Sequence, residues 1–306
     1  MASCAPPATP LPAPPPQIST TRTPQFSKSP TSTPQVQITN SQLPTPSPRP
    51  FDAAQDKSPV AISRTLNPEE WKEWPVIPAV DPGIRDIYEY GQTLGNDPHT
   101  FSLFGDCQAR PEEFFGVFEI DADLPKTLSP ELQETVAHFK GSFNRESPTA
   151  QDGTTPGALL WTQWHQGQFT CTFAETPVEC ELRIHRPSFV IIQIGTHFES
   201  RNTEYLRKII GQLIDAGVVP ILATKADNRE KDERVNRDMA LLASEYDLPL
   251  WNFWAAVEDL PNRGLYTRDD RPLQGDIYLT DEAARIHRMT GLEALNAVWR
   301  MATSNP

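Results

Sequence analysis

The 306-residue sequence lacks any apolar run approaching 18 residues, so it predicts no membrane-spanning helix. It also lacks His, Cys, Asp and Glu at metal-site spacings, and it has no glycine-rich phosphate loop, so we expect neither a metal nor a bound cofactor. Basic residues are scarce, with 27 Lys and Arg against 40 Asp and Glu and a net charge of −13. So acidic a chain repels phosphate backbones, which argues against nucleic acid as a partner.

Proline is concentrated at one end of the chain. Fourteen of the 32 prolines fall in residues 1–50, and most of the rest of that stretch is Ser, Thr, Ala and Gln. Such a composition cannot bury enough apolar surface to offset the entropy of ordering. Five Lys and Arg against two Asp in residues 1–65 leave a charge of −16 on residues 66–306. We predict a disordered Pro/Thr/Ser-rich tether over 1–65 and one acidic domain over 66–306.

There are only four cysteines, and two of them bracket a short segment. Cys171 and Cys180 enclose a polar, proline-containing stretch that suits a closed loop. A disulfide there would contribute up to about 3 kcal/mol. The alternative is a pair of reduced surface thiols.

A third cysteine lies at the start of the chain. Met1-Ala2-Ser3-Cys4 resembles the end of a bacterial lipobox, although the charged and apolar signal regions are not in this sequence. This interpretation predicts lipidation of Cys4 and an extracytoplasmic protein, secreted or held at the membrane by lipid alone. Chance is the alternative, because Ala, Ser and Cys are common neighbours.

Strands and helices alternate along the rest of the chain. Apolar runs predict buried strands at about 101–105, 188–195, 218–224 and 248–254, and amphipathic spacing predicts helices at about 203–216, 231–246 and 281–302. Short links between such elements imply right-handed crossovers. The expected fold is therefore α/β, with a parallel sheet between two layers of helices.

Polar residues follow each predicted strand. Asp106 and Cys107 follow the first and His197 the second, while Asp227 and Asn228 follow the third; Asn252 lies near the end of the fourth. The carboxyl ends of parallel strands share one edge, where ligands bind, so these residues are expected to line one crevice. For Asp227 and Asn228, a role as helix caps is an equal alternative.

The turn Gly105-Asp106-Cys107, after the run Phe101–Phe104, resembles the first block of the SGNH (GDSL-type) hydrolases, with cysteine in place of the serine nucleophile. The resemblance covers most of residues 85–300, although each motif is short. It implies a three-layer, flavodoxin-like fold and an ancestral acyl-ester hydrolase, acting on carbohydrate or small esters. In that family, glycine and Asn amides stabilise the oxyanion, and a D-x-x-H block precedes the last helix.

The remaining blocks match only in part. Gly141 is the candidate for the second-block glycine, and Gly195 matches the third block, where His197 replaces the family's Asn. In the final block Tyr278 takes the histidine position, and Asp276 lies one residue after the aspartate position. With a pKa of about 10, tyrosine is a poor base at neutral pH. Loss of a general base costs roughly two to four powers of ten in rate.

Two hypotheses follow from these changes. In the first, Cys107 and His197 form a thiolate–imidazolium pair that hydrolyses or transfers acyl groups. In the second, the domain is non-catalytic, and its crevice binds a small-molecule or glycan ligand or serves as an interaction surface. His287 lies on the last helix, beyond the final block, and is expected to be a surface or helix residue. The oligomeric state stays open.

Overall fold

The computed structural model describes residues 66–304, so the tether and Cys4 lie outside the described residues. The strands are β1 (Asp97–Gly105), β2 (Pro187–Gln193), β3 (Val219–Ala223) and β4 (Leu250–Trp251). The α-helices are α1 (Ile84–Leu94), α2 (Val117–Ile120), α3 (Pro130–His138), α4 (Pro156–Leu159), α5 (Pro177–His185), α6 (Asn202–Asp215), α7 (Arg234–Glu245), α8 (Phe253–Ala256) and α9 (Asp281–Thr303). Short 3₁₀ helices are η1 (Pro68–Glu73), η2 (Cys107–Ala109), η3 (Leu124–Thr127) and η4 (Pro261–Gly264). Among the helices of this part of the chain, none is both long and apolar enough to cross a membrane.

The four strands form one parallel sheet in the order β1-β2-β3-β4. This confirms the α/β prediction. The fourth strand is shorter than its apolar run suggests, because the side chain of Asn252 accepts a hydrogen bond from Ala255 N and starts α8 directly after Trp251.

A further segment pairs with the outer edge of β1. Gly105 N donates to Thr149 O at 2.9 Å, and Ala150 forms a parallel bridge with Gly105. The Thr149 hydroxyl donates to Leu103 O at 2.8 Å. Because this segment lies between β1 and β2 in the chain, the spatial order is second, first, third, fourth, fifth, as in flavodoxin-like folds. The strand order therefore reverses direction between β1 and β2, where such folds bind ligands.

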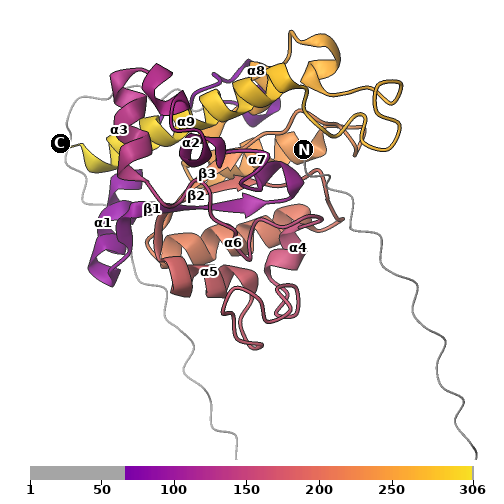
Figure 1. The fold of residues 1–306 in the computed structure, drawn as a ribbon. Helices are drawn as coiled ribbons and strands as arrows, with labels where there is room; N and C mark the ends of the chain where they lie inside the picture. Colours follow the sequence, from indigo (N-terminus) through magenta and orange to yellow (C-terminus); the bar gives the residue numbers. More distant parts are fainter. Residues whose placement is uncertain (1–65, 305–306) are drawn as a thin grey trace, which may run out of the picture. The chain divides into compact units, whose positions relative to one another are not determined.

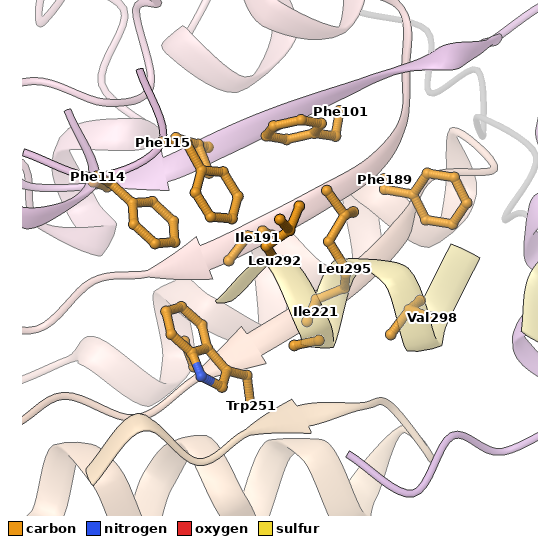
Figure 2. Close-up of a cluster of buried hydrophobic side chains, with 14 of the residues drawn as sticks. Phe101, Phe114, Phe115, Phe189, Ile191, Ile221, Trp251, Leu292, Leu295 and Val298 are labelled. Atoms are coloured by element: carbon orange, nitrogen blue, oxygen red, sulfur yellow. The ribbon is translucent and has the colours of Figure 1, made fainter. Parts of the chain in front are cut away.

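Alternate strand residues feed two separate cores. Phe101, Leu103 and Ile191 pack on the face covered by α1, α3 and α9, whereas Phe104 and Ile192 pack on the face covered by α5, α6 and α7. Figure 1 shows α3 and α9 on one side of the sheet and α5 and α6 on the other. The aromatic first core, with α9 lying across the strands, is drawn in Figure 2. The two buried faces make the three layers.

A disulfide lies outside the sheet. The structure joins Cys171 to Cys180, with their Cα atoms 5.3 Å apart. Cys180 belongs to α5, which starts with a reciprocal capping box between Thr176 and Glu179. The bond therefore ties the loop before α5 to the helix itself.

Candidate functional site

The Gly-Asp-Cys turn lies at the carboxyl end of β1. Asp106 is 1% exposed and accepts backbone hydrogen bonds from Gln108 N at 3.4 Å and His197 N at 3.1 Å. The first bond caps η2, and the second joins the turn to the loop after β2. Cys107 begins η2 and is only 2% exposed. The turn is therefore in the predicted place, with its thiol buried.

His197 lies against Asp106. Its Nδ1 is 3.7 Å from Asp106 Oδ2, beyond hydrogen-bond length, and this buried nitrogen has no hydrogen-bond partner within residues 66–304. Gly195 precedes it with φ of 140°, and a Cβ there would come within 2.4 Å of Val235 Cγ1. Glycine at 195 thus lets the loop pass α7 and bring His197 to Asp106. A pairing of His197 with Cys107 stays a prediction.

The final block also meets the Gly-Asp-Cys turn. Gln108 Nε2 donates to Ile277 O at 2.9 Å. Tyr278 O accepts from Tyr266 N at 3.0 Å, and the neighbouring Leu279 bridges Leu265 in antiparallel fashion. The segment thus lies beside the Gly-Asp-Cys turn.

A cavity of about 20 Å³ lies at this edge of the sheet, which is room for about one water molecule. Its polar lining comes from three strand-end loops: Asp106, Gln108, Gln193, Thr196, Lys225 and Asp227. We call it the narrow cavity. Neither Cys107 nor His197 is among its lining residues. An acyl ester does not fit in it.

Buried charges surround the narrow cavity. Lys225 Nζ donates to Asp227 Oδ1 at 2.8 Å and to Glu230 Oε2 at 2.6 Å, and all three residues are nearly inaccessible to solvent. Asp227 Oδ2 also accepts from the Thr196 hydroxyl at 2.7 Å. Sequence reasoning picked out Asp227 and missed Lys225 and Glu230. A lysine two residues before an aspartate, directly after a buried strand, was the available signal.

The two predicted asparagines have different settings. Asn252 is fully buried; its Nδ2 donates to Trp71 O at 2.9 Å and Trp74 O at 3.0 Å, and its Oδ1 accepts from the Thr224 hydroxyl at 3.0 Å. It therefore ties η1 to the end of β4. Asn228 Oδ1 accepts from Glu233 N at 3.1 Å, yet the residue also lines a surface pocket.

Gly141 lies away from this edge of the sheet. Its N–H donates to the carboxylate of Glu119, and the neighbouring Ser142 hydroxyl accepts from Phe101 N at 3.3 Å. Phe101 is four residues before Gly105 in β1, roughly 13 Å along the strand. The loop that does follow the segment beside β1 contains Gly153, with φ of 77°. Gly153, and not Gly141, therefore lies in a loop at this edge of the sheet.

His287 is a residue of the last helix, as expected, but it is not on the surface. It is fully buried in α9, between the rings of Phe114 and Phe253, and its Nε2 contacts the amide nitrogen of Gln193. Burial, and after it the charge of Arg288, lowers the pKa of His287 well below the ordinary 6.5. Gln193 lines the narrow cavity, so a neutral imidazole supports its floor.

A larger pocket lies next to the narrow cavity and shares Leu265 with it. Its volume is about 600 Å³, and we call it the open pocket. Its polar lining residues are Asn228, Arg229, Lys231, Asn262, Arg263, Arg268 and Asp276. Asp276 Oδ2 is 3.4 Å from Arg268 Nε, and its Oδ1 accepts from Asn262 Nδ2 at 3.3 Å. Of these residues, sequence reasoning selected only Asn228 and Asp276.

A third pocket, of about 300 Å³, lies beside the segment that pairs with β1. Trp164 and Phe169 line it together with Arg110, Gln151 and Asp152. Arg110 NH1 donates to Asp152 Oδ2 at 3.1 Å. Aromatic rings beside amide and charged groups suit a polar organic ligand.

Metal chemistry finds no support in the described part of the chain. Across residues 66–304 there is no group of three or more His, Cys, Asp or Glu side chains that could hold a metal ion.

Comparison with protein-family models and with curated protein sequences gave no match. Among solved structures, this chain resembles one described as a GDSL-like lipase from Bacteroides thetaiotaomicron. The TM-score is 0.40 and the identity 12%, over 71% of this chain and 98% of that one. So distant a likeness carries no argument about activity.

Proposed function

We propose that residues 66–304 form an SGNH/GDSL hydrolase-like domain that binds a ligand beside the carboxyl edge of its sheet and does not hydrolyse esters. The family assignment is supported by the Gly-Asp-Cys turn at the end of β1, by the flavodoxin-like strand order and by the final block beside the turn. The loss of hydrolysis is supported by one observation above all. Cys107 is 2% exposed, and it lines none of the three pockets described above.

Ester attack requires the acyl carbon within about 3–3.5 Å of the nucleophile. A thiol buried in a packed turn does not admit that approach. The geometry therefore favours the non-catalytic hypothesis.

An extracytoplasmic location belongs to the same proposal. Disulfides persist in oxidising compartments and are rare in the cytosol. The Cys171–Cys180 bond supports an exported protein. A lipid on Cys4 stays a prediction, since that residue lies outside the described residues.

To test the proposal, we would measure ester hydrolysis by the full chain. The substrates are p-nitrophenyl acetate, p-nitrophenyl butyrate and acetylated xylan. We expect wild type and Cys107→Ala to show the same background rate. Hydrolysis restored in the double variant Cys107→Ser, Tyr278→His would support descent from an active enzyme. Wild-type hydrolysis that Cys107→Ala abolishes would refute the proposal.

One observation favours the hydrolase as a second candidate. His197 Nδ1 lies 3.7 Å from Asp106 Oδ2, so a histidine is held beside the residue that precedes the thiol. In that case the Cys107 thiolate would displace the alcohol from the ester, and water would then release the acid from the thioester. Activity lost in both Cys107→Ala and His197→Ala, at unchanged stability, would establish it.

A further inference from the structure

We propose that the open pocket binds an oxyanion, namely a carboxylate, phosphate or sulfate group on a small ligand. The pocket lies between the loop after β3, residues 228–231, and the segment that runs from within η4 toward α9, residues 262–276. This inference goes beyond the proposed function and holds whether or not Cys107 acts on esters.

The charge of the pocket is the first argument. Arg229, Lys231, Arg263 and Arg268 line it with a single carboxylate, that of Asp276. Four cations gathered in one pocket are unexpected in a chain of net charge −13. A pocket lined by one sign of charge attracts ligands of the opposite sign.

The pairing of these cations is the second argument. Within residues 66–304, no carboxylate forms an ion pair with Arg229, Lys231 or Arg263; Arg268 alone is paired. Elsewhere on the surface, arginines pair readily: Arg207 with Glu245 at 2.8 Å, for example. Cations without a protein partner inside a concave pocket remain available to an anionic ligand.

Two of the guanidinium groups are fixed in place. Arg229 NH1 donates to Thr196 O at 3.0 Å, and Arg263 Nε donates to Ala226 O at 3.0 Å. In the described part of the chain, Nε is the only side-chain atom of Arg263 with a hydrogen bond. Its two terminal nitrogens keep their donors for a ligand. A guanidinium held this way presents parallel N–H groups that match carboxylate or phosphate oxygens.

The backbone around the pocket is strained. Lys231, Asn262, Arg263 and Asp276 have φ of 72°, 48°, 50° and 64°, so four of the ten non-glycine left-handed residues in the described chain line this one pocket. Strain of this kind clusters at binding sites. The volume of about 600 Å³ suits a ligand of one or two sugar units.

A substitution at Asp276 should strengthen anion binding, whereas substitution of the cations should weaken it. Its carboxylate is the only negative group lining the pocket, and it pairs with Arg268. Asparagine tolerates the left-handed conformation that residue 276 adopts. Asp276→Asn therefore removes a repelling charge and releases Arg268 without new backbone strain.

Isothermal titration of the full chain tests the proposal. The probes are inorganic phosphate, inorganic sulfate and D-glucuronate at constant ionic strength, with D-glucose as the neutral control. We expect at least one anion to bind and glucose not to bind. Arg263→Gln should weaken binding about tenfold, because it removes a charge-assisted hydrogen bond. Asp276→Asn should tighten it about threefold, and Arg207→Gln, outside the pocket, should leave it unchanged.

Comparison of the three anions also identifies the chemical group that carries the negative charge of the ligand. Binding of glucuronate alone indicates a uronic acid or another carboxylate, whereas binding of phosphate or sulfate alone indicates the corresponding ester. Arg229→Gln should also weaken anion binding, and it replaces Arg263→Gln as the test if that variant does not fold. Absence of binding by all three anions, or equal affinity in wild type and both arginine variants, would overturn the proposal.

Discussion

The narrow cavity and the open pocket share Leu265, yet they use charge in opposite ways. In the narrow cavity, Lys225 is buried and neutralised by Asp227 and Glu230. In the open pocket, Arg263 reaches solvent and pairs with no carboxylate among residues 66–304. Position at the carboxyl edge of a sheet therefore does not by itself mark a residue as functional. The partners of each charge separate residues that hold the fold from residues that can hold a ligand.

The strongest test of this difference between the two regions is to remove one cation from each of them. We expect Lys225→Met to cost about 3–5 kcal/mol of unfolding free energy, because it leaves buried Asp227 and Glu230 uncompensated. The matched variant Arg263→Met should cost less than about 1 kcal/mol. Urea denaturation measures both. Similar costs for the two variants would mean that the distinction between the regions is wrong.

The pH dependence of stability should come from buried groups and not from the open pocket. Burial holds the folded-state pKa of His287 well below 6.5 and lowers that of His185 to about 4, with Arg145 a second cause for His185. Below pH 6.5 the unfolded chain binds protons that the folded chain does not. The contribution of these histidines is thus fully present above pH 6.5 and is lost as the pH falls toward 4, with a slope of about 1.4 kcal/mol per pH unit for each.

Replacing one histidine isolates its share of that slope. His287→Leu should flatten the loss between pH 6.5 and 4 by the contribution of one group, while His185 and His138, whose pKa values burial also lowers, keep theirs. The stability of Arg263→Gln should change with pH as that of wild type does. Denaturation midpoints measured across this range provide the comparison, and a wild-type stability that rises on acidification would contradict the assignment.

The two asparagines should differ in a similar way. Asn252→Ala removes the donor to Trp71 O and Trp74 O inside the protein and should cost about 2 kcal/mol. Asn228→Ala, at the rim of the open pocket, should cost less than about 1 kcal/mol. Thermal unfolding of the two variants side by side gives the difference. Equal losses would show that Asn228 is as structural as Asn252.

The smallest effect is expected at Asp276. Because its side chain is exposed and its ion pair lies at the surface, Asp276→Asn should change stability by less than about 0.5 kcal/mol. The same variant should still raise anion affinity. A loss of stability above 1 kcal/mol would show that the carboxylate holds its loop.

The fold was predictable where the signal was local. The run 188–195 is apolar almost throughout, and this is typical of a strand buried on both faces, as β2 is. The convergence of the strand-end loops then followed from topology. Which side chains would be neutralised there did not follow, because the partners of Lys225 depend on how the loop after β3 folds back.

His287 shows why the buried face of the last helix could not be predicted in full from the sequence. The apolar stripe visible in the sequence runs through Met289 and Leu295, but the most buried face of α9 also includes Ala283, His287 and Gly291. These residues add little apolar signal. Gly291 is needed because a Cβ there would lie 2.7 Å from the ring of Phe114. That contact comes from a distant part of the chain, which helical periodicity does not reveal.

The most direct test of the central claim, that the Gly-Asp-Cys crevice is closed and does not hydrolyse esters, is the alkylation of Cys107 by iodoacetamide near neutral pH. The experiment uses a Cys4→Ser variant, so that Cys4 is not alkylated, and mass spectrometry of the Cys107 peptide measures the modification of Cys107 itself. The account predicts slow modification that becomes fast only on unfolding, with the same rate in His197→Ala. Rapid alkylation of the native protein that slows in His197→Ala would contradict it and establish an activated thiol.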